Sequence, residues 1–183
     1  MRNHSLVMLA FTISAPMFAA SAQTPPPPPP TEAKTSAAPY VKAAGMSDLY
    51  EINSSQVAME RSQNPAIRRY AAMLIKHHQM TTASTMAAAK KAGMSPAKPM
   101  LDPGASASVR ELQTVAVANF DRTYLAQQVP AHQAALDLHM SYGRDGDQPA
   151  LRASAKKAVP IVKQHLAAAE KTKDGGMAGN HGM

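Results

Sequence analysis

The sequence predicts an all-α protein built as a four-helix bundle with a long connection between its second and third helices. Four segments carry apolar residues at the three- to four-residue spacing that gives a helix one buried face. Between the second and third segments, residues 94–106 contain three prolines and a glycine, which indicate a connection without helix. At up to about 3.3 Å per residue, this connection can run the full length of the bundle.

Capping and breaking residues set the bounds of the four predicted helices. Ser47 suits the N-cap of the first helix, with Asp48 in its first turn. Pro65 suits the start of the second helix, and Gly93 follows its end. Prolines at 130 and 160 are expected to kink the third and fourth helices. The predicted helices span residues 47–62, 65–92, 107–142 and 149–172.

Composition divides the chain into four parts. Residues 1–22 have the form of a signal peptide, with Arg2, a short apolar stretch and the cleavage site Ala20-Ser21-Ala22. Residues 23–39 form a proline-rich linker, 40–172 the helical domain, and 173–183 a flexible tail rich in glycine, methionine and histidine. We therefore expect a periplasmic or outer-membrane-associated protein. The mature sequence has no stretch of the ~20 apolar residues that span a bilayer.

Composition also narrows the classes of partner. Because the chain has no cysteine, we expect neither disulfides nor a cysteine-linked lipid anchor. The net charge of +7 is dispersed, and with three Phe and no Trp there is little on which bases can stack, so no nucleic-acid partner is expected. Residues 25–30 are all proline and predict a polyproline II spacer; an envelope or protein partner stays open.

Two adjacent histidines in the second predicted helix are the first candidates for a functional site. At 100° per residue, His78 falls on the inward face and His77 on its flank, in line with Met73 and Met80. One interpretation is that His78 is a hydrogen-bonded core residue and the methionines are packing. The other is a metal ligand, because neutral imidazole and thioether suit soft or borderline metals.

Counting residues from the helix ends predicts that one ionisable side chain from each helix meets the others at mid-height of the bundle. These residues are Glu51, His78, Asp121 and His165. His132 is predicted to lie about 16 Å further along, nearer His139. Bundles build metal sites from facing helices in this way. The alternative is a buried polar layer that fixes the packing.

A ferritin-like di-metal site is not expected. Such a site needs a Glu-x-x-His motif on two helices, and the residues three before His78 and His165 are Ile75 and Val162. Too few carboxylates remain to bridge two hard metal ions. Nor does the sequence contain a nucleophile arrangement or a phosphate-binding loop that would indicate an enzyme.

Three stretches resemble a bacterial exported family called domain of unknown function 4142. They are SDLYEINSSQVAMERSQNPAIRRYAAMLIKHH, NFDRTYLAQQVPAHQAALDLH and the pair His165-Leu166. The resemblance covers about residues 40–171 and implies a ferritin-like fold, an envelope location and no established activity. That family usually has Asp at the position of His77. The His-His pair is similar instead to a second exported group, domain of unknown function 305, some of whose members handle copper.

The sequence supports two hypotheses of different classes. The first is an envelope protein that binds a transition-metal ion, with copper, zinc, iron and manganese as candidates, at the mid-bundle residues. A narrower form of it places Cu(I) on Met73, His77 and Met80, aided by the tail residues Met177, His181 and Met183. The second hypothesis is a metal-free structural or stress-related interaction module of the envelope.

Overall fold

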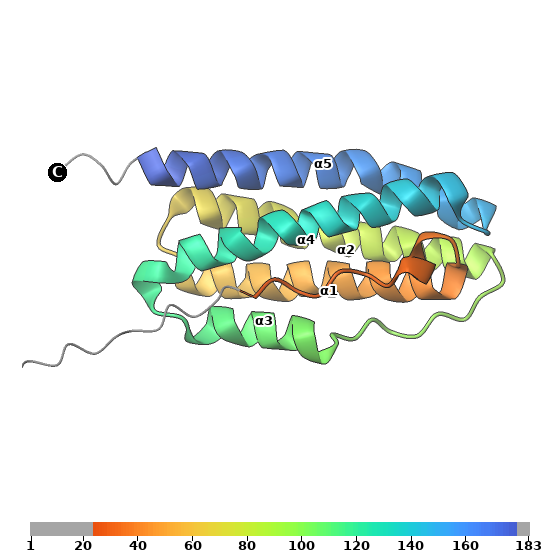
Figure 1. Ribbon diagram of the computed structural model, residues 1–183, viewed down its shortest axis with the longest axis horizontal. Coiled ribbons are helices and arrows are strands. Elements are labelled where there is room, and N and C mark those ends of the chain that lie inside the picture. Colours follow the sequence, from red (N-terminus) through yellow and green to blue (C-terminus); the bar gives the residue numbers. More distant parts are fainter. Residues whose placement is uncertain (1–23, 179–183) are drawn as a thin grey trace, which may run out of the picture.

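The computed structural model describes residues 24–178, with side chains to residue 174, and confirms the all-α fold. Four long helices lie side by side along one axis (Figure 1): α1 (Ala37–Arg61), α2 (Pro65–Lys91), α4 (Val117–Asp145) and α5 (Pro149–Ala178). α1 and α2 form one hairpin, α4 and α5 form the other, and the hairpins meet where α2 packs on α5 and α1 on α4.

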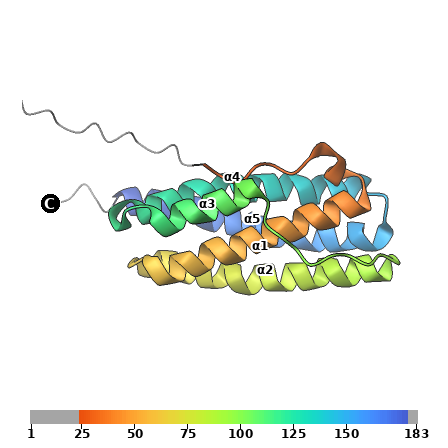
Figure 2. The same cartoon turned by 90° about the horizontal axis from the view of Figure 1, so that it is seen from below.

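Two shorter elements lie against the outside of the four long helices. The short helix α3 (Pro103–Thr114) contacts α1 and α4, and the 3-10 helix η1 (Thr31–Lys34) contacts the same two helices (Figure 2). The connection from α2 runs along only part of the bundle, and α3 continues in the same direction toward the end where α4 begins (Figure 1). None of the helices within residues 24–178 is long and apolar enough to cross a bilayer.

The third predicted helix, residues 107–142, is two helices in the structure. The chain turns between Thr114 and Val117, where the guanidinium group of Arg61 donates to the carbonyl oxygens of Leu112 and Val115. The guanidinium carbon also lies 5.4 Å from the centre of the Phe120 ring. These contacts satisfy carbonyl groups that the end of α3 leaves free. Arg61, which is far from this turn in the sequence, therefore stabilises a break between α3 and α4 that the spacing of apolar residues does not reveal.

The start of α3 also differs from the prediction. The expected connection reached Ser106, but α3 begins at Pro103. Asp102 caps it, because its Oδ1 accepts a hydrogen bond of 2.7 Å from the backbone N–H of Ala105. The same Asx-Pro arrangement begins α2, where Asn64 Oδ1 accepts from the N–H of Ala66 at 2.9 Å.

The first helix begins at Ala37 instead of Ser47. The additional residues of the helix bury apolar surface, which favours the longer helix. Tyr40 is fully buried and stacks on Tyr142 with 3.8 Å between ring centres. The helix continues through Gly45, against which Pro99 packs so closely that a Cβ atom there would lie 2.9 Å from the proline ring. Asp48, predicted in the first turn of the helix, consequently lies within α1 and is buried.

Both later helices extend past their predicted ends, α4 to Asp145 instead of Tyr142 and α5 to Ala178 instead of Thr172. Pro130 and Pro160 lie inside these helices, as predicted. The predicted signal peptide, residues 1–22, and the last five residues of the predicted tail lie outside the described residues.

The proline run does not extend away from the domain as a spacer would. Residues 24–30, which we call the N-terminal strap, fold back along the bundle beside α1, α3 and α4 (Figure 2). The carbonyl oxygen of Thr24 accepts a hydrogen bond of 2.9 Å from Ser108 Oγ. Pro26 and Pro29 are both partly buried, and their spacing of three places them on one side of a polyproline II helix.

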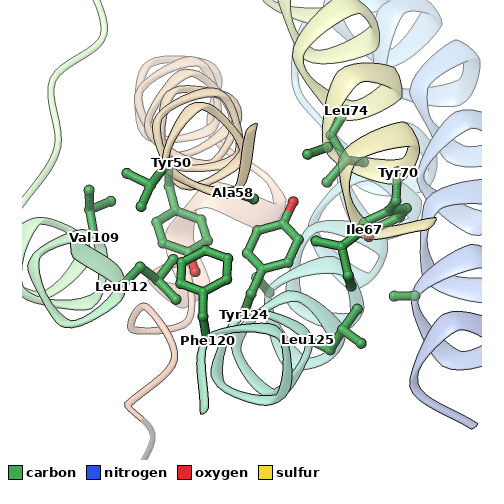
Figure 3. Packing of buried hydrophobic residues seen from close by; sticks show 14 of the residues in the cluster. Tyr50, Ala58, Ile67, Tyr70, Leu74, Val109, Leu112, Phe120, Tyr124 and Leu125 are labelled. Atoms are coloured by element: carbon green, nitrogen blue, oxygen red, sulfur yellow. The ribbon is translucent and has the colours of Figure 1, made fainter. Parts of the chain in front are cut away.

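Two hydrophobic clusters fill the bundle. One includes Tyr50, Leu74, Phe120 and Tyr124 (Figure 3), and the other includes Tyr40, Leu138, Tyr142 and Leu151. Along α2 and α4, buried polar residues lie between the positions that belong to the two clusters. This polar layer holds the candidate site.

Candidate metal centre

Three histidines from three different helices meet in the polar layer. His78 of α2, His132 of α4 and His165 of α5, here called the histidine trio, each place one ring nitrogen within 4.8 Å of those of the other two. Their exposed fractions are 2%, 0% and 0%. The ring centres are 4.9–5.6 Å apart, so the three imidazoles surround one small volume.

Hydrogen bonds at the outer nitrogens fix two of the rings. His78 Nδ1 lies 2.8 Å from Asp48 Oδ1, and His132 Nδ1 lies 2.9 Å from the backbone carbonyl oxygen of Gln128. Both partners are acceptors, so Nδ1 carries the proton in each ring and donates it. Nε2 of each neutral ring then keeps a free lone pair, as in the carboxylate–histidine–metal arrangements of metalloproteins.

The third ring is paired with the fourth histidine of the cluster. His165 Nε2 lies 2.9 Å from His77 Nδ1, and the two rings are stacked at an interplanar angle of 19°. When His165 Nε2 donates this hydrogen bond, its Nδ1 has the free lone pair. His77, which the sequence also suggests as a candidate ligand, is thus in direct contact with the trio.

Each trio member retains one buried nitrogen without a hydrogen bond: His78 Nε2, His132 Nε2 and His165 Nδ1. Burial of a polar atom without a partner costs free energy, roughly 1–3 kcal/mol each. Three such atoms in contacting rings are unusual for a layer that serves packing alone, because native cores satisfy most buried polar groups. A metal ion bound by all three nitrogens would remove the cost.

Asp48 is a candidate site residue that the prediction from the sequence did not include. Its buried carboxylate accepts hydrogen bonds from His78 and, at 2.9 Å each, from the hydroxyl groups of Thr81 and Thr82. The signal in the sequence was the spacing of Asp48 and Glu51 by three, which puts both carboxylates on one face of a continuous helix. The misplaced helix start at Ser47 hid that signal.

Glu51 lies beside the trio and is not satisfied by any described residue. It is 1% exposed, and its Oε1 is 3.7 Å from His132 Nδ1. Both carboxylate oxygens lack a hydrogen bond within the described residues, as do the nearby Tyr70 hydroxyl and the Gln128 side-chain oxygen. Burial raises the pKa of Glu51 to about 8, although the charge of His78 opposes the shift. Glu51 therefore keeps its proton at neutral pH in the metal-free protein, and it becomes an additional, anionic ligand only when that proton is released as an ion binds.

The electrostatics favour neutral rings at two of the three positions. Burial and the charge of His78 lower the pKa of His132 to about 3. The same two causes lower the pKa of His165 to about 2. Burial also lowers the pKa of His78, but the hydrogen bond and charge of Asp48 outweigh it and raise the pKa overall. Neutral imidazole is the form that ligates metals.

The structure separates Asp121 from the other predicted ligands. Its Oδ1 accepts a hydrogen bond of 2.6 Å from Ser62 Oγ, next to the end of α1. The reason is the break before Val117, which places Asp121 near the start of α4 instead of the middle of one long helix. Asp121 is absent from the group of side chains that could hold a metal ion within the described residues.

His132 takes the place that Asp121 was expected to fill. The prediction put His132 about 16 Å away, but its ring centre is 5.6 Å from that of His78 and 5.3 Å from that of His165. Because α4 continues to Asp145, the residue that faces His165 lies further along α4 than predicted. His139 forms a separate contact, with its Nδ1 3.0 Å from the Tyr40 hydroxyl.

The two methionines of the predicted copper stripe lie in different surroundings. Met73 is partly buried and packs against the hydrophobic cluster of Figure 3, whereas Met80 is 57% exposed. Of the tail residues, His181 and Met183 lie outside the described part of the chain, and the side chain of Met177 is not described. The Cu(I) stripe stays a prediction.

Comparisons with known proteins agree with this fold. The model of the family described as domain of unknown function (DUF4142) matches residues 22–172, which confirms the predicted family. No curated protein matches the chain. CopM in its Cu(II)-bound form has a TM-score of 0.65 at 14% sequence identity, covering 76% of this chain and 97% of CopM. A DUF305 fragment from Deinococcus radiodurans has a TM-score of 0.65 at 18% identity, covering 81% and 99%. At these identities the likeness establishes a shared fold.

Proposed function

We propose that this chain, which belongs to the DUF4142 family, binds one transition-metal ion between His78, His132 and His165. The observation that carries the proposal is the set of three buried ring nitrogens that have no hydrogen bond. One ring nitrogen of each histidine lies within 4.8 Å of those of the other two, which suits ligands of a single ion. Asp48 and the Gln128 carbonyl hold two of the rings in the tautomer that a metal requires.

The ligand set favours Cu(II) or Zn(II) over harder ions. Three imidazoles with one available carboxylate, Glu51, and no thiolate suit both metals, and divalent copper binds such ligands most tightly in the first-row series. Iron and manganese usually have more oxygen ligands than this site offers. The Cu(II)-bound form of CopM provides a precedent for a copper ion in a protein of similar fold.

The enclosure of the site supports binding of an ion instead of turnover of a substrate. The trio is at most 2% exposed, so an ion held there is shielded from other molecules. If residues 1–22 are removed on export, as the sequence predicts, the protein would hold the metal in the cell envelope. We therefore propose a metal-holding function without catalysis.

Metal analysis of the mature chain tests the proposal. Protein starting at Gln23 would be stripped with chelator, loaded separately with Cu(II), Zn(II), Fe(II) and Mn(II), desalted and analysed for bound metal. We expect about one equivalent of copper or zinc, and His132→Gln should lose it. His139→Gln is the matched control, because His139 is equally buried but bonds to Tyr40. Absence of stoichiometric uptake of any of the four metals by the unaltered protein would disprove the proposal.

The metal-free interaction module remains the alternative if uptake fails. Thermal melting separates the two functions, because an ion that binds only the folded state raises the melting temperature. The metal hypothesis requires a higher melting temperature after loading and its reversal by EDTA. An identical melt with and without metal would instead favour the module.

A further inference from the structure

The histidine trio is closed to solvent, so a metal ion must pass another side chain to reach it. The neighbours that contact the trio from α1 and the near part of α2 are themselves buried, with exposed fractions of 4% for Asp48, 1% for Glu51 and 5% for Tyr70. His77 differs from them. It contacts His165 and is partly exposed. Among these contacts, His77 alone joins the trio to the surface.

The two rings of His77 and His165 form a continuous pair between solvent and the trio. Their ring centres are 5.1 Å apart, and one hydrogen bond, His77 Nδ1 to His165 Nε2, links them. His77 Nε2 forms no hydrogen bond with any residue that the structure describes. His165 Nε2 faces His77, and the other ring nitrogen of His165, Nδ1, is buried and has no hydrogen bond.

We propose that His77 is the outer ligand through which a metal ion enters and leaves the histidine trio, an inference that rests on the proposed function. The ion binds first to His77 at the surface. It then passes to the free lone pair of His165 Nδ1 when the two rings part. The proton on His165 Nε2 stays in place, so the ring remains neutral, and a turn of the His165 ring carries the ion inward to the free nitrogens of His78 and His132.

The contact between α2 and α5 is suited to the small opening that this step needs. The two helices also touch through short side chains about two turns from His77 and about three turns from His165. There Ser84 Oγ and Ser154 Oγ are 3.2 Å apart. Pro160 lies in α5 a little more than one turn before His165. Proline removes a backbone hydrogen bond and weakens the helix locally. α5 can therefore move at this point at lower cost than an uninterrupted helix.

Exchange kinetics with Cu(II) and Zn(II) test the inference. The mature chain would be mixed with each metal in stopped-flow, and release would be followed into excess chelator; competition with the chelator gives the dissociation constant. The variant His77→Leu keeps a side chain of similar size but has no nitrogen. We expect both the uptake and the release rate to fall at least about tenfold, with a dissociation constant that changes less than either rate.

Two further variants complete the design. His77→Asp restores a ligand at the same position, so its rates should return toward those of the unaltered protein. Gln79→Ala is the matched control, because Gln79 is an exposed neighbour on α2 and should exchange metal normally. Circular dichroism would confirm that each variant is folded before the rates are compared.

The outcomes separate this inference from the proposed function. If the unaltered protein binds metal and His77→Leu exchanges it at the same rate or faster, the His77 route is wrong and the trio stands. If His77→Leu weakens binding through faster release alone, His77 only positions His165, and the route is again wrong. If the unaltered protein takes up no metal, both proposals fail together.

Discussion

Three hydrogen bonds converge on the buried carboxylate of Asp48, from His78, Thr81 and Thr82. The carboxylate holds His78 in the tautomer that leaves Nε2 free and supplies negative charge beside the proposed ion. In the proposed site, Asp48 would act on the metal through His78 without touching it.

The first prediction concerns Asp48→Asn. The amide is the same size but neutral, so it holds His78 less firmly and no longer favours a cation. We expect metal affinity to fall by roughly 10–100-fold, measured by competition with a chromophoric chelator. Asp137→Asn is the control, because Asp137 is exposed and pairs with Lys34 on the surface. Equal affinity in the two variants would contradict the role of Asp48.

The second prediction concerns the pH dependence of the metal-free protein. Burial raises the pKa of Glu51 from 4.5 to about 8. Between these values the unfolded chain loses a proton that the folded protein keeps, so Glu51 makes stability fall as pH rises. Glu51→Gln cannot titrate, and at pH 8 it should raise the free energy of unfolding by roughly 1–3 kcal/mol.

Urea denaturation in EDTA at pH 5, 6.5 and 8 measures this effect. The advantage of Glu51→Gln over the unaltered protein should grow steadily with pH. Glu60→Gln, at an exposed position of the same helix, should show no such trend. An advantage that stays constant from pH 5 to pH 8 would mean that Glu51 is already ionised in the folded protein over this range.

At the residue scale, the sequence predicted the inward face of His78 but only part of the cluster. The spacing of apolar residues shows which face of a helix a residue is on. Whether residues of two helices lie at the same level in the bundle can be worked out only when the ends of both helices are known. The break before Val117 and the extension of α4 to Asp145 changed the heights of Asp121 and His132. The predicted site therefore contained Asp121 where the structure has His132.

At the scale of elements, one arginine side chain joins three helices. Arg61, the last residue of α1, donates to two carbonyl oxygens at the end of α3 and lies over Phe120 in α4. The helix periods of α3 and α4 nearly continue into each other, so the sequence predicted one helix. A hydrogen bond between residues so far apart in the chain leaves no local pattern.

The third prediction is that Arg61→Met destabilises the corner where the ends of α1 and α3 meet the start of α4. The change removes hydrogen bonds from a charged donor and leaves carbonyl groups unsatisfied, so the free energy of unfolding should fall by about 1.5–3 kcal/mol. Arg69→Met, exposed on α2, is the matched control. Urea denaturation measures both. Because the corner is distant from the trio along α4, Arg61→Met should still bind metal, and a loss of binding in the folded variant would contradict the separation of the two regions.

At the scale of the whole molecule, the N-terminal strap is part of the folded domain. Thr24 bonds to α3, Pro26 and Pro29 pack toward small residues of α1 and α4, and Gly104 leaves room for Pro27. The run was predicted as a spacer because polyproline II needs no partner. Its docking depends on a groove that only the assembled helices form, and such a groove has no local signature in the sequence.

The fourth prediction compares the chain that starts at Gln23 with one that starts at Thr31. Loss of the strap uncovers apolar surface on α1 and α4, so the shorter chain should be less stable by roughly 1–2 kcal/mol. A spacer would contribute nothing to stability. The free energies of unfolding of the two chains, determined in urea, distinguish these cases, and equal values would show that the strap does not pack in solution.

The division of the histidine trio between the two hairpins has a consequence for how the protein unfolds. His78 belongs to the α1–α2 hairpin, while His132 and His165 belong to the α4–α5 hairpin. An ion bound by all three histidines would therefore link the two hairpins, as a disulfide links two parts of a chain. This chain has no cysteine with which to form such a disulfide. Without the ion, each hairpin could keep its helices yet open independently of the other. The cooperativity of unfolding would then depend on whether metal is bound, and the helix content would depend on it much less.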